Sequence, residues 1–146
     1  MKPFRNPRTP VWIGRILIGL VIFSNLQCAV YFLVHPEYFA PAYELSGIPG
    51  EAAIRGFAIL FCMWNIPYLF AVAHPIRHRT SLIESNLMQF TGLLGESWLV
   101  TQIPLQYAVL RNSIFRFIIF DGAGLLLLFL ALVMTRGLTR PTVKNE

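Results

Sequence analysis

Residues 81–104 read SLIESNLMQFTGLLGESWLVTQIP, a stretch long enough to cross a bilayer as one helix at about 1.5 Å of rise per residue. The stretch nevertheless contains Glu84, Asn86, Gln89 and Glu96. Ionisable and amide side chains inside a bilayer are costly unless they face protein or water, so we expect this segment to turn them toward other helices. It therefore predicts a membrane bundle built around the polar face of this helix.

The composition of the whole chain is typical of membrane proteins. Of its 146 residues, 55% are hydrophobic and 13% are charged, and the mean hydropathy is +0.59. A soluble domain of this size needs more polar surface to cover its core. The net charge is +5, and the basic residues that produce it lie between the apolar segments rather than on one soluble face. This distribution argues for the lipid bilayer and against nucleic acid as a partner.

Three further segments, residues 11–34, 51–73 and 113–135, are also apolar and long enough to span. With residues 81–104 they predict an all-α, integral-membrane four-helix bundle that forms a single domain over residues 1–146. Residues 35–50 contain three prolines and two glycines, so we expect a surface connection with a short helical turn within residues 37–44. In the second span, Pro67 predicts a kink beside Asn65.

Local signals predict where two of the spans begin. Ser81 and Glu84 have the spacing of a capping box, which places the start of the third span near residue 81. Asn112 or Ser113 is expected to cap the fourth span after a tight return over residues 105–112.

The distribution of charge predicts an orientation. With four spans, both chain ends and the connection at residues 74–80 lie on one side of the membrane. That side carries the basic residues Lys2, Arg5, Arg8, Arg15, Arg77, Arg79, Arg136, Arg140 and Lys144. By the positive-inside rule, we expect both termini in the cytoplasm and the protein to be a multi-pass protein of the cell membrane.

Eight polar or charged side chains inside the spans form the candidate site. They are Asn25, Gln27, Arg55, Asn65, Gln89, Glu96, Arg116 and Asp121. Counted from the outer ends of the spans, the two arginines lie about one turn deep and the two carboxylates about two turns deep. The amides of the first span reach a similar level, and those of the second and third spans lie deeper.

Two interpretations of this cluster stay open. A lone charge at the bilayer centre costs about 2.5–3.5 kcal/mol on insertion scales, and ion pairs between the arginines and the carboxylates would relieve that cost. In the first interpretation the cluster is an outward-open pocket, in which the arginines hold an anionic group and a carboxylate relays a proton. In the second it is a closed polar lock that fixes helix register. Ser85, Gln89, Gly92 and Glu96 share one helical face, and Gly92 and Gly95 are expected to let a neighbouring helix approach closely.

Catalytic chemistry has little support in the sequence. His74 and His78 are separated by Pro75 and lack an evident third ligand, so no metal site is expected. No nucleophile–base pair or phosphate loop is present, and no cofactor is assigned. The first hypothesis is therefore a non-enzymatic protein that binds a small anionic or quinone-like ligand. The second hypothesis is a structural subunit of a larger membrane complex, which implies a membrane-protein partner. The third is a small transporter, which would require a homo-oligomer.

The first half of the chain resembles the DoxX-like group of small four-helix membrane proteins. The resemblance lies in RILIG at residues 15–19, in His35-Pro36, and in GIPG at residues 47–50, and it covers about residues 11–73. It implies a four-helix membrane fold, and some members of the group are linked to quinone-coupled sulfur oxidation or redox-stress complexes. The better-known members have an acidic residue early in the second span, where this chain has Arg55 and Asn65. No catalytic residue is therefore carried over.

Overall fold

The computed structural model describes residues 8–136 and 138, and this part of the chain is all-α. It contains four long helices, α1 (Arg8–Val34), α3 (Gly47–Ala73), α4 (Arg79–Gln102) and α5 (Ala108–Met134). A short helix α2 (Pro36–Phe39) and a 3₁₀ helix η1 (Ala40–Tyr43) follow α1. The expected all-α class is confirmed, but the described residues form five α-helices rather than four. The fifth arises because Pro36 pre-sets the backbone for a helix start.

Three of the described helices, α1, α3 and α5, are long and apolar enough to cross a membrane. The helix α4 is as long as a span but carries the polar residues described above, which lower its hydropathy. Many large apolar side chains of the long helices face outward, for example Phe23, Ile119 and Leu126, at 66%, 72% and 58% exposure. Such a surface suits lipid rather than water.

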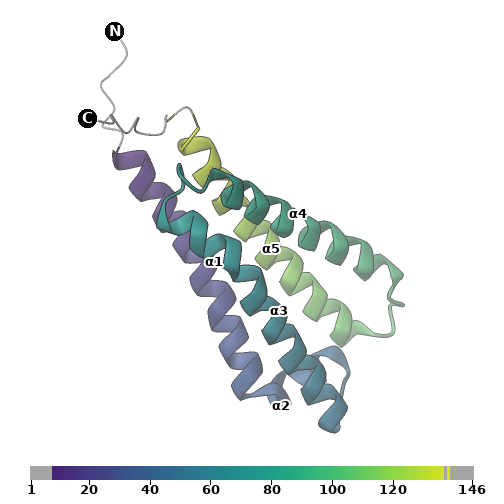
Figure 1. Cartoon of the computed structure of the whole chain (residues 1–146). Helices are drawn as coiled ribbons and strands as arrows, with labels where there is room; N and C mark the ends of the chain where they lie inside the picture. Colours follow the sequence, from purple (N-terminus) through teal and green to yellow (C-terminus); the bar gives the residue numbers. More distant parts are fainter. Residues whose placement is uncertain (1–7, 137, 139–146) are drawn as a thin grey trace, which may run out of the picture.

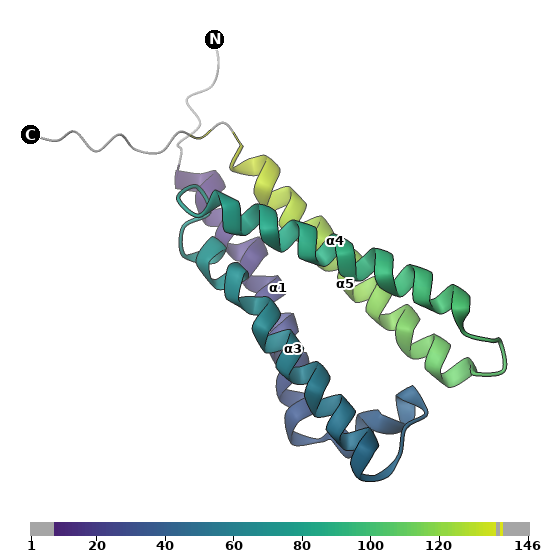
Figure 2. The ribbon, with the colours of Figure 1, turned by 45° about the vertical axis from the view of Figure 1, so that its right-hand side comes forward.

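The long helices run lengthwise, and the start of α1 and the end of α5 lie at the same end of the bundle (Figure 1). The two helices approach closely at this near end, because a Cβ added to Gly14 of α1 would lie 3.2 Å from Cγ2 of Thr135, the residue that follows α5. Figure 2 shows α1 and α3 as one pair and α4 and α5 as another, which meet at the near end and separate toward the far end. The helices α2 and η1 lie at the far end, beside the end of α1 and the start of α3 (Figure 2).

Two apolar cores hold the bundle. The first joins all four long helices through Ile18, Val21, Ile22, Tyr68, Ala71, Leu82, Leu128 and Ala131. The second lies among α1, η1 and α3 and contains Ala29, Phe32, Ala40, Ile54 and Ala58. Partly buried Phe117 of α5 packs against this second core. The Ser113 hydroxyl also ties the far end together, because it donates to the Ala42 carbonyl at 2.6 Å.

The helix starts differ from those expected. The helix α4 begins at Arg79 and α5 at Ala108, so Ser81 and Ser113 lie inside helices and neither is a cap. The N-cap residues His78 and Tyr107 make no side-chain cap hydrogen bond. The capping-box prediction and the predicted start of the fourth span were therefore wrong.

Arg111, within the first turns of α5, stabilises the connection between α4 and α5. Its Nη1 donates to the Val100 and Ile103 carbonyls, each at 2.6 Å. These contacts satisfy carbonyls that the end of α4 leaves without helical partners. The return needs only residues 103–107, and the fourth long helix gains five residues over the predicted start.

Candidate functional site

A chain of buried hydrogen bonds joins three of the long helices. The Tyr68 hydroxyl of α3 donates to Gln89 Oε1 of α4 at 2.8 Å. Gln89 Nε2 in turn donates to Asp121 of α5, at 2.8 Å to Oδ1 and 3.3 Å to the backbone carbonyl. Gln89 is 3% exposed and Asp121 8% exposed. The polar face of α4 is therefore turned inward, as the sequence predicted, and its central amide bridges α3 and α5.

Two glycines make this bridge possible. A Cβ added to Gly124 would lie 2.8 Å from Gln89 Nε2, and a Cβ added to Gly92 would collide with Asp121 Oδ2. The expectation that Gly92 permits close approach of a neighbouring helix is confirmed. The same expectation for Gly95 was wrong, because a Cβ there would meet nothing within 4 Å.

Next to this bridge lies a cavity of about 260 Å³. Side chains of α1, η1, α3, α4 and α5 line it: Asn25, Phe32, Tyr43, Phe57, Leu60, Phe61, Trp64, Gln89, Gly92, Glu96, Leu99, Ile114, Phe117 and Asp121. Its volume is just below the usual range of small-molecule pockets, about 300–1,000 Å³. It resembles such pockets in being largely apolar with a few polar groups.

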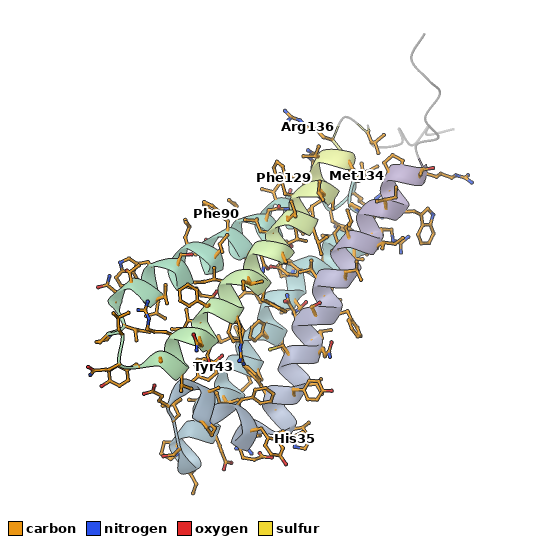
Figure 3. The ribbon with its side chains drawn as sticks, turned by 180° about the vertical axis from the view of Figure 1, so that it is seen from behind. His35, Tyr43, Phe90, Phe129, Met134 and Arg136 are labelled. Atoms are coloured by element: carbon orange, nitrogen blue, oxygen red, sulfur yellow. The ribbon has the colours of Figure 1, made fainter. Side chains whose placement is uncertain are left out.

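Six aromatic side chains line the cavity, and several of their rings contact one another. The ring centroids of Phe61 and Phe117 are 5.9 Å apart, and each is 6.3 Å from the centroid of Phe32. Tyr43 continues the wall at 5.5 Å from Phe57. Burial raises the pKa of the Tyr43 phenol well above its usual range, so this ring is neutral. Figure 3 shows Tyr43 and His35 toward the far end, and Met134 and Arg136 at the near end.

Three side chains that line the cavity contain a buried polar atom without a hydrogen-bond partner, and one of these atoms is the Nε1 donor of Trp64. Asn25 is 2% exposed, and its Oδ1 accepts no hydrogen bond. Glu96 Oε2 is also buried and without a partner. Buried polar atoms are normally satisfied, and unsatisfied ones are costly. These oxygens therefore provide unused acceptor capacity inside the cavity, which a ligand or water can satisfy.

The cavity reaches the outer surface of the bundle between α3 and α4. Phe57 and Leu60 of α3 line it and are 37% and 53% exposed, and Leu99 of α4 lines it and is 43% exposed. These rim residues are apolar and belong to the outward-facing surface of the long helices. In a membrane the opening therefore faces lipid.

The structure brings together only part of the predicted cluster. Asn25, Gln89, Glu96 and Asp121 line the cavity, while Asn65 is buried elsewhere and its amide donates to the Phe61 carbonyl at 2.7 Å. The remaining three members, Gln27, Arg55 and Arg116, are exposed and do not line the cavity. The predicted cluster is therefore divided into a cavity group, a buried amide and three surface residues.

The expected ion pairs between the arginines and the two carboxylates are not found among the described residues. Arg55 instead pairs with Glu51 at 3.2 Å on the outside of α3. Arg116 precedes Asp121 by five residues, which places it roughly 140° around α5 at 3.6 residues per turn. Because α5 begins at Ala108, Asp121 lies about 20 Å from the start of this helix. It is therefore deeper than the two helical turns expected.

The aromatic wall was not predicted, although part of its signal is in the sequence. Phe57, Phe61, Trp64 and Tyr68 follow one another at spacings of four, three and four residues, which places them on one face of α3. This is the same spacing as that of Ser85, Gln89, Gly92 and Glu96 on α4. Matching periodicity on two neighbouring helices would have indicated that an aromatic face meets a polar face.

The fold and the site define an all-α protein with three helices able to cross a membrane and an aromatic cavity beside a buried polar bridge. Comparison with known proteins finds no matching family model, no matching curated protein and no matching solved structure. Within the described ranges, no group of three His, Cys, Asp or Glu side chains is placed to hold a metal ion.

Proposed function

We propose that this chain is a multi-pass protein of the cell membrane that binds a small, ring-bearing ligand in the cavity between α3 and α4. The observation that carries the proposal is the combination of aromatic walls with two unpartnered buried oxygens, those of Asn25 and Glu96. Apolar walls with a few polar groups are the usual design of small-molecule sites.

In this proposal α4 is a fourth crossing. Its 24 residues extend about 36 Å, enough for the hydrocarbon core of about 30 Å. Its most polar central side chains, Ser85 and Gln89, are buried against other helices rather than facing lipid. Four crossings leave both termini on one side, and the positive-inside rule makes that side cytoplasmic. The cavity then lies in the outer half of the membrane.

The cavity and the polar bridge have separate roles in this proposal. The bridge of Tyr68, Gln89 and Asp121 is held by hydrogen bonds at both ends of the Gln89 amide and fixes the register of α3, α4 and α5. Glu96 accepts no hydrogen bond at Oε2 and belongs to the ligand site. The pocket and the lock considered from sequence are thus adjacent parts of one interior.

The cavity suits a quinone-like ring better than a small anion. None of the described residues that line it is basic, and the two arginines expected to hold an anion lie outside. Membership of the DoxX-like group stays a prediction, and the proposal does not depend on it. The hypotheses of a structural subunit and of an oligomeric transporter also stay predictions, and the oligomeric state in detergent tests the second.

Tryptophan fluorescence can test for a ring-bearing ligand. Trp12 and Trp98 are 59% and 65% exposed, whereas Trp64 lines the cavity. Replacing Trp12 and Trp98 by Phe leaves Trp64 as the single reporter. With the protein in nanodiscs, duroquinone should quench this fluorescence in a saturable manner. The matched control replaces Trp12 and Trp64 and keeps lipid-facing Trp98, for which quenching should rise linearly. Linear quenching of both reporters would contradict a quinone site.

A further inference from the structure

We propose that the natural occupant of this cavity is an organic cation, an ammonium group on an apolar or aromatic body. This inference rests on the proposed function and specifies the charge of the ligand. It begins with the sign of the groups that line the cavity. Glu96 and Asp121 are acidic, Tyr43 is a neutral phenol, and the other described lining residues carry no charge.

The two carboxyl groups lie on one side of the cavity. Asp121 Oδ2 lies against Gly92 of α4, and Glu96 is one helical turn further along the same helix. Asp121 Oδ1 is occupied by the Gln89 amide, but Glu96 Oε2 has no partner. The buried Asn25 Oδ1 is a further oxygen that accepts no hydrogen bond. These oxygens accept hydrogen bonds or positive charge, whereas the Nε1 of Trp64 is an unpartnered donor in the same lining.

The aromatic walls favour the same ligand. Phe32, Phe61 and Phe117 line one part of the cavity as a cluster whose ring centroids are 5.9–6.3 Å apart. Tyr43 and Phe57 continue the wall. Ring faces attract cations, and an alkylated ammonium is held in proteins by aromatic cages combined with acidic groups. A neutral quinone would use the rings but would offer no positive charge to the two carboxyl groups.

Two probes of the same shape separate charge from shape. Benzyltrimethylammonium carries a permanent positive charge, and neopentylbenzene has carbon in place of the nitrogen. With Trp64 as the single tryptophan, in nanodiscs of phosphatidylglycerol, the cation should bind saturably and ~tenfold or more tightly than the neutral isostere. Glu96→Gln should weaken binding of the cation more than binding of the isostere and so remove most of this preference. Glu84→Gln, at an exposed site that does not line this cavity, is the matched control and should keep the preference.

The outcomes distinguish the inference from the proposed function. If the isostere or duroquinone binds as tightly as the cation, and Glu96→Gln changes neither, the cavity is a ligand site but the inference is overturned. If none of the three probes binds saturably, the proposed function fails as well. Thermal unfolding of each variant shows that it is folded. Repeating the measurement in nanodiscs of phosphatidylcholine separates a lipid headgroup from a free ammonium compound as the natural ligand. A choline headgroup that enters the site would compete with the free cation and weaken its binding.

Discussion

The side-chain amide of Gln89 donates to the carboxylate of Asp121 at 2.8 Å, close to the middle of both α4 and α5. The same amide accepts from Tyr68 through its oxygen, so one side chain uses both of its ends to hold two other helices. In a bilayer such a bond has no water to replace it, because the surrounding lipid offers neither donors nor acceptors.

Replacing Gln89 by Leu should therefore destabilise the bundle by about 1–3 kcal/mol, since it leaves the Asp121 carboxylate without the amide donor. The Tyr68 hydroxyl would keep only the Ser85 carbonyl, at 3.3 Å. Thermal unfolding in detergent, followed by circular dichroism, measures this loss. Gln102→Leu is the control, because Gln102 is exposed and bonds only to its neighbour Thr101 among the contacts described. Equal unfolding temperatures for the two variants would contradict a stabilising bridge.

Gly92→Ala and Gly95→Ala should have opposite effects. The added methyl at Gly92 collides with Asp121, which the Gln89 amide holds in place, and the expected cost is about 1–3 kcal/mol. The methyl at Gly95 enters open space, where Ala in place of Gly in a helix gains up to about 1 kcal/mol. Thermal unfolding of the two variants measures both changes in stability. A similar loss for both variants would show that α4 and α5 do not approach each other at Gly92.

Labelling of single cysteines from either side of the cell membrane tests the four crossings. In a chain with Cys28 and Cys62 replaced by Ala, Glu44→Cys and Tyr107→Cys should react with a membrane-impermeant maleimide added to intact cells. Thr80→Cys should react only after permeabilisation. All three positions are exposed at ends of the long helices. Labelling of positions 80 and 107 from the same side would mean that α4 does not cross.

The architecture followed from sequence because it depends on length, hydropathy and period. Residues 81–104 were expected to turn their polar face inward, and the buried Gln89 confirms this. The helix starts were not predicted, because Arg111, eight residues beyond Ile103, and not a local capping side chain, satisfies the end of α4. That contact depends on a fold in which α5 returns along α4, and no short-range signal contains it.

The site was predicted only in part for a related reason. Depth was estimated from the expected helix ends, and an error of five residues at the start of α5 changed the depth of Asp121. Electrostatic arguments then paired Arg55 and Arg116 with the carboxylates. Long basic side chains near helix ends can reach the interface by themselves, so those pairs were never required to neutralise the arginines. The periodicity of Phe57, Phe61 and Trp64 indicates one aromatic face of α3, but the complete wall depends on packing among four elements.

The far-end contact between Ser113 and the Ala42 carbonyl has a consequence for access to the cavity. Together with the bridge at Gln89, it places connected protein at both ends of the cavity along the bundle axis, while the apolar rim of Phe57, Leu60 and Leu99 opens sideways. Solutes then arrive by way of the hydrocarbon phase. The relevant ligand concentration is then the concentration dissolved in the lipid. At a fixed aqueous concentration, occupancy of the cavity should therefore rise with the lipid–water partition coefficient of the solute.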